Sequence, residues 1–378
     1  MLAPKGFYFF YFAAFAALLP FLVLYYEQLE FTGQQIGVLS AIFPLMMLAG
    51  APIWGAIADA SQRHKTVLLS LMGASLAMAF IVSRVTTFTA LTLLVALFAF
   101  FIAPVIPLGD TAVLNILGEQ RRNYGRIRVW GAVGWGLSAP LVGILTERFD
   151  LIWAFYAYML LMAACMFNSL RLQVEASEKH KRDTNLRAFL TPTWRYCLTA
   201  AFCTGIGLTV SGNFVYLYLT ELSATGLIVG LALTMATLSE LPLTFYGRQL
   251  LARFQSQHLM LFALACVVLR LVLYSLFESP LLVLLVQLLH GFSFSIMWIA
   301  GVAYADEYAP AGKQATAQGL FSATMMGLGG AAGGLIAGYL YDLIGTQRMF
   351  QSIALGLLLC TLLLAFNMPY RVTATAND

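Results

Sequence analysis

Charged residues are scarce in this chain of 378 residues. Asp, Glu, Lys and Arg together account for 10% of it, against about a quarter in an ordinary soluble domain. Hydrophobic residues make up 61%, and the mean hydropathy is +0.83. This composition excludes a soluble domain and indicates an all-α polytopic membrane protein whose surroundings are the lipid bilayer. The net charge of +4 indicates topology rather than a nucleic-acid partner.

Motifs for metal, nucleotide and covalent chemistry are also missing. The five cysteines are scattered through apolar runs and form no CxxC, so neither a disulfide framework nor a zinc site is indicated. No HExxH and no GxxxxGK[ST] occurs, which excludes a zincin and an ATP-driven pump. Gly109 and Asp110 lack the preceding glycine expected of a membrane aspartyl protease. We therefore expect no enzyme, no cofactor and no bound metal.

Long apolar runs are plentiful. A helix needs about 20 apolar residues to cross the bilayer core. The first run follows Lys5 and is longer than a signal-peptide core, so it is expected to be a retained helix. The sequence predicts twelve transmembrane helices, at 6–29, 34–58, 66–84, 88–117, 124–146, 151–171, 194–220, 226–251, 258–277, 280–305, 314–341 and 347–367.

The basic residues predict the orientation. With a cytoplasmic N-terminus, most of the 21 Lys and Arg residues fall on the inside, and only Arg84, Arg148 and Arg348 fall outside. We therefore expect both termini in the cytoplasm, and a bacterial inner membrane as the location.

A polar interval, 172–193, divides the chain into two similar halves, 1–171 and 194–378. The stretch FLVLYYEQLEFTGQQIG from Phe21 matches FVYLYLTELSATGLIVG from Phe214 at a constant offset of 193 residues. Late in each half, an offset of 195 superposes two glycine pairs, Gly134 on Gly329 and Gly143 on Gly338. These repeats predict two pseudo-symmetric six-helix bundles, an arrangement found in secondary transporters, joined by a cytoplasmic linker. Two covalently joined bundles form one pathway, so we expect a functional monomer.

The loop GAIADASQRHK, Gly55 to Lys65, resembles the cytoplasmic motif of the major facilitator superfamily. Asp59, Arg63 and Lys65 stand in the matching places, although the usual second glycine is absent. The resemblance implies a cytoplasmic gate, in which Asp59 pairs with an arginine or a helix terminus of the other bundle. The alternative is a solvated loop that only sets the topology.

Further motifs recur in the order seen in phenylpropionate-permease-like transporters. They are P-L-x-D at 107–110, Y-G-x-x-R-x-W-G at 124–131, S-E at 239–240, V-V-x-R at 267–270, L-H-G at 289–291 and A-Q-G at 317–319. The chain resembles that group over nearly its whole length and, more distantly, the lactose permease group. The resemblance implies proton-coupled transport of an aromatic carboxylate such as a phenylpropionate.

Two arginines, Arg126 and Arg128, lie in an otherwise apolar helix, where a charge is costly without a partner. Asp110, eighteen residues before Arg128, is the predicted partner. Arg128 and Trp135 share one helix face, so we expect a guanidinium about ten ångströms from an aromatic plane. These residues suit a carboxylate or hydroxyls on the arginine and a ring on the indole. Arg126 points away and is expected at the cytoplasmic interface.

Three more ionisable residues fall on consecutive predicted helices of the second half, namely Glu240, Arg270 and His290. The lactose permease group has an acid, an arginine and a histidine on these helices, with an additional acid where Ser293 stands here. We expect Glu240 to carry a coupled proton, with Arg270 and His290 as modulators and Asp110 as a competitor of substrate for Arg128. A satisfied packing histidine is the alternative for His290.

Asn213 and Gln287 are weaker candidates for substrate binding, and helix–helix hydrogen bonding explains them equally well. The predicted function is proton symport of a small organic solute by alternating access, with an aromatic carboxylate, a sugar and a nucleoside left open as substrates. The alternatives are efflux by proton antiport and, more remotely, a non-transporting membrane sensor.

Overall fold

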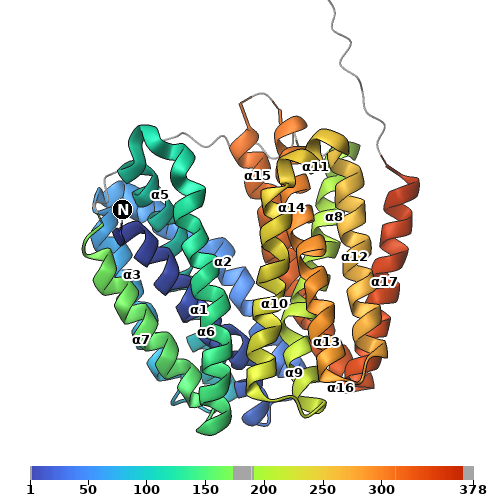
Figure 1. Cartoon of the computed structure of the whole chain (residues 1–378), viewed down its shortest axis with the longest axis horizontal. Helices are drawn as coiled ribbons and strands as arrows, with labels where there is room; N and C mark the ends of the chain where they lie inside the picture. The colour runs from blue at the N-terminus through green and yellow to red at the C-terminus, as the bar shows by residue number, and fades with distance from the viewer. Residues whose placement is uncertain (1, 173–188, 190, 311, 369–378) are drawn as a thin grey trace, which may run out of the picture.

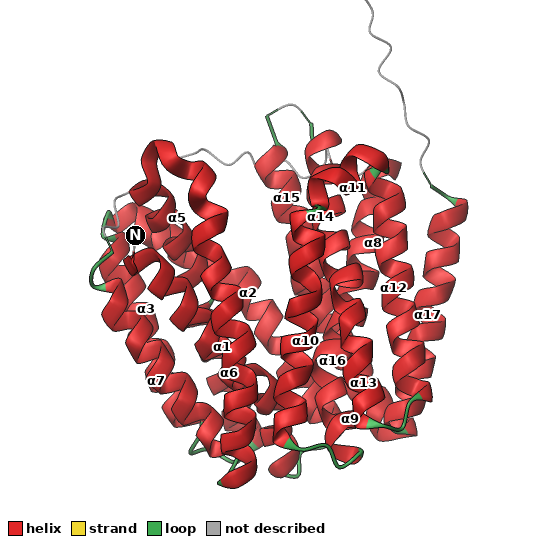
Figure 2. Ribbon diagram, in the orientation of Figure 1, coloured by secondary structure: helices red, strands yellow, loops and turns green. Residues whose placement is uncertain are grey.

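The computed structural model describes residues 2–172, 189, 191–310 and 312–368. Every regular element in these ranges is a helix (Figure 2). Twelve helical segments of the described chain are long and apolar enough to cross a membrane. The predicted twelve-helix architecture is therefore confirmed, and the larger part of the linker expected at 172–193 lies outside the described residues.

Six of the membrane-length segments come from the first half of the chain (Figure 1). They are α1 Leu2–Gln28, α2 Gly33–Ser61, α3 His64–Val82, the pair α4 Phe88–Ile102 and α5 Val105–Leu117, α6 Tyr124–Arg148, and α7 Ile152–Ser169. A short 3-10 turn, η1 Gly118–Asn123, joins α5 to α6.

The second half repeats this plan, and three of its six segments change helix type along their length. The first of these comprises α8 Pro192–Thr209, the π-helical η3 Val210–Phe214 and α9 Val215–Glu221. Single segments follow in α10 Gly226–Phe245 and α12 Ser256–Leu276, with the short α11 Gly247–Arg253 between them. The next segment comprises α13 Pro280–Val286, the 3-10 turn η4 Gln287–Leu289 and α14 His290–Glu307. It is followed by α15 Gln314–Ser322, the π-helical η5 Ala323–Gly329 and α16 Gly330–Ile344. The last segment is α17 Thr346–Phe366.

The matched repeats occupy equivalent places. Thr32 and Thr225, which the offset of 193 superposes, are the N-caps of α2 and α10, and each side chain accepts a backbone N–H of the first turn. Such a cap satisfies one of the unpaired donors at a helix start. The same residue type therefore begins the second span of each half.

The molecule has two opposite ends, which we call the terminal face and the far face. The terminal face carries the start of α1 at Leu2 and the end of α17 at Phe366, and the far face carries the end of α1 at Gln28 and the start of α17 at Thr346. In Figure 1 the ribbons of the two halves run close together toward the far face and diverge toward the terminal face.

Glycines form two close contacts between the halves near the far face. A Cβ on Gly338 of α16 would overlap the Gly33 carbonyl of α2 and lie 2.7 Å from the Cα of Gly37. In the repeated contact, a Cβ on Gly143 of α6, the equivalent of Gly338, would overlap the Gly226 carbonyl of α10, and a Cβ on Gly230 would lie 2.6 Å from the Cα of Pro140. Small residues thus let the backbones of paired helices touch directly. The two contacts are related by the internal repeat.

Hydrogen bonds between the halves lie on the same side of the molecule. Asp342 of α16 accepts the backbone N–H groups of Gly33, with its Oδ1 at 2.5 Å, and of Gln34, with its Oδ2 at 2.8 Å. A carboxylate at the start of α2 is favoured by the unpaired donors and the dipole of that helix. Deeper in the protein, the Thr234 hydroxyl of α10 donates to the Gly136 carbonyl of α6 at 2.8 Å.

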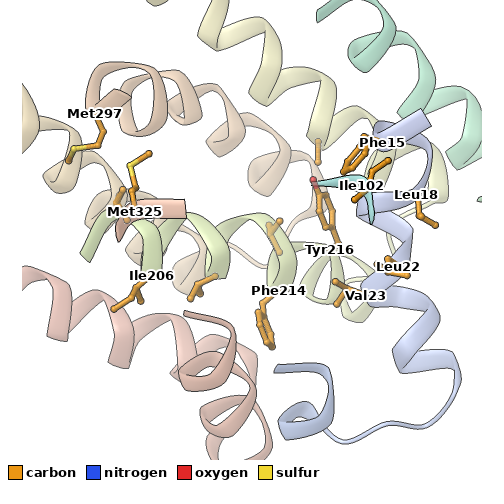
Figure 3. Close-up of a cluster of buried hydrophobic side chains, with 14 of the residues drawn as sticks. Phe15, Leu18, Leu22, Val23, Ile102, Ile206, Phe214, Tyr216, Met297 and Met325 are labelled. Atoms are coloured by element: carbon orange, nitrogen blue, oxygen red, sulfur yellow. The ribbon is translucent and has the colours of Figure 1, made fainter. Parts of the chain in front are cut away.

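Apolar side chains complete the junction. Figure 3 shows part of the buried cluster there, with Leu18, Leu22 and Val23 on α1 and Phe214 and Tyr216 on η3 and α9. Beside this junction a cavity of about 570 Å³ opens between the halves, lined by residues that include Leu24, Glu27, Glu147, Thr220 and Val229. The far side of the molecule is thus the closed side.

Candidate functional site

The predicted pair of Arg128 and Asp110 is formed. Nη1 of Arg128 on α6 donates to both carboxylate oxygens of Asp110 on α5, at 2.9 and 3.1 Å, and to the Tyr124 hydroxyl at 2.8 Å. The two residues meet because α5 and α6 are neighbouring helices of opposite direction joined by the short η1 turn. The intramembrane charge therefore has the partner that its cost requires.

Tyr8 of α1 belongs to the same network, which the sequence did not reveal. Its buried side chain donates its O–H to Asp110 Oδ1 at 2.5 Å. Glycines on the neighbouring helices bring α1 this close, because a Cβ at Gly109 would overlap the ring of Phe7 and a Cβ at Gly134 would overlap the carbonyl of Phe9.

Three aromatic rings surround the Arg128 guanidinium. Its Cζ lies 5.6 Å from the ring centre of Tyr8, 5.8 Å from that of Phe12 and 5.9 Å from that of Tyr124. Trp135, one turn beyond Ala132 on α6, lies with its ring centre 5.9 Å from that of Phe12. Phe12 thus lies between the arginine and the tryptophan, a residue that the sequence did not place there.

One edge of Arg128 carries no partner in the described part of the chain. All three of its hydrogen bonds start from Nη1, which leaves Nε and Nη2 unoccupied. The side chain is 40% exposed and that of Asp110 is 27% exposed. Nε and Nη2 are thus adjacent N–H donors on a partly exposed side chain, the arrangement that binds two oxygens of one group.

Arg270 of α12 has the opposite environment. Its side chain is 1% exposed, and its two terminal nitrogens donate to four acceptors. Nη1 lies 3.2 Å from His290 Nδ1 and 2.9 Å from Ser293 Oγ, while Nη2 lies 3.2 Å from the Tyr274 hydroxyl and 3.0 Å from Gln287 Oε1. This arginine is enclosed and cannot reach a solute directly.

The three predicted ionisable groups of the second half come together through His290. Its Nε2 lies 3.2 Å from Oε1 of Glu240 on α10, and its Nδ1 faces Arg270. The side chains of His290 and Glu240 are 21% and 28% exposed. Gly291 permits the approach, since a Cβ there would overlap the Ser239 carbonyl of α10. Glu240 therefore lies at an accessible end of a chain of contacts whose other end is buried.

Gln287 and Asn213 lie in different settings. The Gln287 side chain is buried and bound to Arg270 and Tyr274, so its observed partners are within the protein. Asn213 lies in the π-helical turn η3 and is half-buried, and its side chain has no hydrogen-bond partner among the described residues. Single π-turns inside helices are frequent at functional sites. The roles of both residues in substrate binding stay predictions.

The residues of the predicted gate have partners within their own half. Asp59 at the end of α2 has its Oδ1 2.9 Å from Nε2 of His64, and the Lys65 ammonium donates to the Leu170 carbonyl at 2.7 Å. Arg63 is exposed. The gate stays a prediction, and in this conformation these residues do not bridge the halves.

Five residues of the two clusters were missed from the sequence: Tyr8, Phe12, Tyr124, Tyr274 and Ser293. Tyr274 is one helical turn from Arg270 and Tyr124 is one turn from Arg128, a spacing that places side chains on the same helix face. That spacing was a usable signal. Tyr8 and Phe12 carried none, because they lie in the uniformly aromatic run FYFFYF.

Comparisons with known proteins agree with this architecture. A family model described as MFS_1 like matches residues 1–352. The maltose permease of Geobacillus stearothermophilus is 29% identical over 365 residues, which cover 94% of this chain and 93% of the permease. The probable 3-phenylpropionic acid transporter of Escherichia coli (strain K12) is 24% identical over 347 residues, covering 89% and 90% of the two chains.

Among solved structures, the nucleoside transporter NupG (D323A mutant) superposes with a TM-score of 0.89 at 18% sequence identity, over 97% of this chain and 99% of that one. This likeness concerns the fold. The extent of the family match shows that the chain belongs to the MFS_1-like family, with the major facilitator fold, and is a multi-pass membrane transporter of small solutes rather than an enzyme.

Proposed function

We propose that the protein is a proton-coupled symporter of a small ring-bearing organic solute whose carboxylate or adjacent hydroxyls bind Arg128. The observation that carries this proposal is the edge of Arg128 formed by Nε and Nη2, which has no partner among the described residues and lies beside three aromatic rings. A guanidinium edge binds two oxygens of one planar group, and an aromatic ring packs on the apolar face of another ring.

Asp110 orients the arginine in this proposal. The sequence predicted that Asp110 would compete with substrate for Arg128. Because Asp110 is bound at Nη1 and the opposite edge has no partner among the described residues, substrate instead binds without displacing it in this proposal. Phe12 and Trp135 then contact the ring of the solute, and Asn213 supplies a polar group from the second half. The names of the similar proteins, a maltose permease, a 3-phenylpropionic acid transporter and a nucleoside transporter, describe solutes that combine a ring with hydroxyls or a carboxylate.

Charge balance links the solute to a proton. Arg128 with Asp110 is neutral overall, and so is Arg270 with Glu240 when His290 is neutral. A bound monocarboxylate would leave an uncompensated negative charge within the membrane, which is unfavourable. Protonation of Glu240 removes that charge, and the proton then travels with the solute. The transport of a neutral sugar or nucleoside would be coupled to protonation of the same carboxylate, Glu240. Each transport cycle would then move one net positive charge across the membrane.

The conformation supports alternating access. We propose that the terminal face is cytoplasmic in a bacterial inner membrane, so the observed state is closed to the outside. In the opposite state the glycine contacts between α2 and α16 and between α6 and α10 separate, and Asp59, Arg63 and Lys65 close the cytoplasmic side. Each monomer would complete this cycle.

The proton carrier is tested by Glu240→Gln in proteoliposomes. We expect loss of accumulation driven by a pH gradient, while exchange of labelled for unlabelled solute continues because exchange needs no net proton movement. Glu30→Gln, at an exposed acid outside the helices, is the matched control. Accumulation at the wild-type level in Glu240→Gln would remove Glu240 from this role, and proton-driven extrusion in place of uptake would establish antiport.

The substrate anchor is tested by Arg128→Lys, because lysine keeps the charge and cannot bind two oxygens side by side. Loss of one charge-assisted hydrogen bond costs about 1.5–3 kcal/mol, so solute binding should weaken roughly 10- to 100-fold by calorimetry. Arg126→Lys is the control, since Arg126 is exposed and has no partner among the described residues. Equal weakening by both substitutions would contradict the assignment.

A further inference from the structure

Arg270 is buried without a carboxylate at hydrogen-bonding distance. In the described residues, its acceptors are Nδ1 of His290 and the oxygens of Ser293, Tyr274 and Gln287. Ion pairs within 4.0 Å in this part of the chain do not include it. The nearest negative charge in this network is Glu240, on the other side of the His290 ring.

The direction of each hydrogen bond follows from which of the two groups has a proton to donate. The Ser293 hydroxyl donates to the His290 carbonyl at 2.9 Å, so its oxygen accepts from Arg270. The Tyr274 hydroxyl donates to Gln287 Oε1 at 3.1 Å, so it also accepts from Arg270. With Gln287 and His290 Nδ1, the four N–H groups of the two terminal nitrogens each have one acceptor.

His290 has a single tautomer that fits these contacts. A guanidinium has donors only, so the Nδ1 atom 3.2 Å from Arg270 Nη1 must be the unprotonated nitrogen. A neutral imidazole then carries its proton on Nε2, the ring nitrogen that lies 3.2 Å from Glu240 Oε1. A second proton on Nδ1 would place two cationic N–H groups face to face.

We propose that Arg270 is a positioning residue that locks His290 as the neutral Nε2–H tautomer and so leaves Glu240 as the one proton acceptor of this cluster. Proton binding is then the addition of a proton to a carboxylate oxygen of Glu240, with no other bond formed or broken. His290 aims its N–H at that carboxylate and does not itself titrate. This inference rests on the proposed proton coupling and adds the reason why one of two adjacent titratable groups takes the proton.

The other neighbours of the ring leave this argument intact. Glu240 from α10 and Arg270 from α12 are the charged groups in contact with His290 in the described structure. Phe294, one turn further along α14, stacks on the imidazole with ring centres 5.5 Å apart. Tyr274 contacts the arginine rather than the histidine.

The tautomer is tested by nitrogen NMR of the ring in liposomes. His64, His180 and His258 are replaced by Gln, so that His290 is the remaining histidine. We expect one protonated and one bare ring nitrogen, assigned to Nε2 and Nδ1, at every pH between about 5 and about 8, where a free imidazole titrates. A proton on Nδ1, or a doubly protonated ring within that range, would overturn the proposal.

Arg270→Gln provides the complementary measurement, since an amide can donate to Nδ1 or accept from it. We expect the ring of this variant to take up a second proton within the same range. A ring that stays neutral in the variant as in the wild type would show that Arg270 is not the lock. The wild-type spectrum decides the tautomer even if the variant does not fold.

Two variants without a titratable side chain at position 290 test the roles of the two ring nitrogens separately, with transport as the measurement. In His290→Gln the amide reaches toward Glu240 in place of Nε2, whereas in His290→Asn the amide oxygen stands in place of Nδ1. We expect His290→Gln to keep proton-driven uptake and His290→Asn to lose it several-fold. Equal behaviour of the two variants would contradict a positioning role. Normal accumulation by Glu240→Gln would instead refute the proton coupling while leaving the tautomer result in place.

Discussion

At the scale of single residues, two arginines of the same membrane protein have opposite accessibility because their partners differ. Arg128 is bound at one nitrogen by a carboxylate and is 40% exposed, whereas Arg270 is bound at both terminal nitrogens by neutral groups and is 1% exposed. A guanidinium with unused donors can bind a solute. One whose terminal nitrogens are both bound within the protein holds its neighbours in place.

Tyr8 offers a prediction at this scale. Tyr8→Phe removes one donor from Asp110, so the carboxylate holds Arg128 in a less defined position. A hydrogen bond to a charged group contributes about 1.5–3 kcal/mol, so we expect solute binding to weaken by roughly 10-fold or more in a calorimetric titration.

The matched control is Tyr11→Phe. Tyr11 is also buried on α1, and its hydroxyl has no hydrogen-bond partner among the described residues. If Tyr8→Phe binds the solute as tightly as Tyr11→Phe, Tyr8 does not contribute to the site.

At the scale of helices, irregular turns occur at matching places in the two halves. Pro20 interrupts α1, and the offset of 193 superposes it on Asn213 in the π-helical η3. By contrast, the π-helical η5, Ala323–Gly329, falls at an offset of 195 on the stretch 128–134 of α6, which is regular α-helix and carries Arg128. Prolines and π-turns both disturb the regular hydrogen bonding of a helix. A proline in the first half thus stands at the place of a π-turn in the second.

The glycine contact between α2 and α16 predicts how the far face opens. Gly338→Ala places a Cβ 2.7 Å from the Cα of Gly37, which the closed state cannot accommodate without a shift. Overpacking of this kind costs about 1–3 kcal/mol, so the open population should rise roughly 5- to 150-fold. The open population is measured by the alkylation rate of a cysteine introduced at the buried Val229, which lines the far-face cavity. The native cysteines are first removed from the protein, so that only this cysteine reacts.

Gly73→Ala is the control, because a Cβ on Gly73 of α3 would meet no atom within 4 Å. The same labelling rate in Gly338→Ala and Gly73→Ala would show that the α2–α16 contact does not keep the far face closed.

At the scale of the whole molecule, the proposed site draws on both halves, so a bound solute should stabilise them together. A ligand present at 100 times its Kd stabilises the native state by about 2.7 kcal/mol. Aromatic monocarboxylates, disaccharides and nucleosides are compared by thermal shift in detergent. We expect the Tm to rise with the class of solute that the protein transports. Arg128→Ala should abolish the rise.

Each carboxylate should be compared with its amide, which keeps the ring and removes the charge. Equal shifts for the acid and the amide would exclude a carboxylate as the group bound by Arg128. An unchanged shift in Arg128→Ala would place the solute elsewhere.

Much of this architecture follows from the sequence by itself. Apolar runs near 20 residues separated by short polar loops leave few alternatives to membrane-spanning helices, because a backbone in lipid must satisfy its own hydrogen bonds. The repeat with a constant offset predicted the two similar halves. The cost of a charge in lipid predicted that Arg128 would pair with Asp110, and that pairing is observed.

Tertiary structure alone decided which groups meet across helices. Tyr8 and Phe12 join the Arg128 cluster because glycines on neighbouring helices allow close approach, and Ser293 joins the Arg270 cluster through the packing of α14 against α12. Helix periodicity in one segment carries no information about rotation against another. The exposed edge of Arg128, the enclosure of Arg270 and the tautomer of His290 depend on distances between atoms of different helices. The sequence determined that charges would be paired in the membrane, and packing decided which donors the pairs left free.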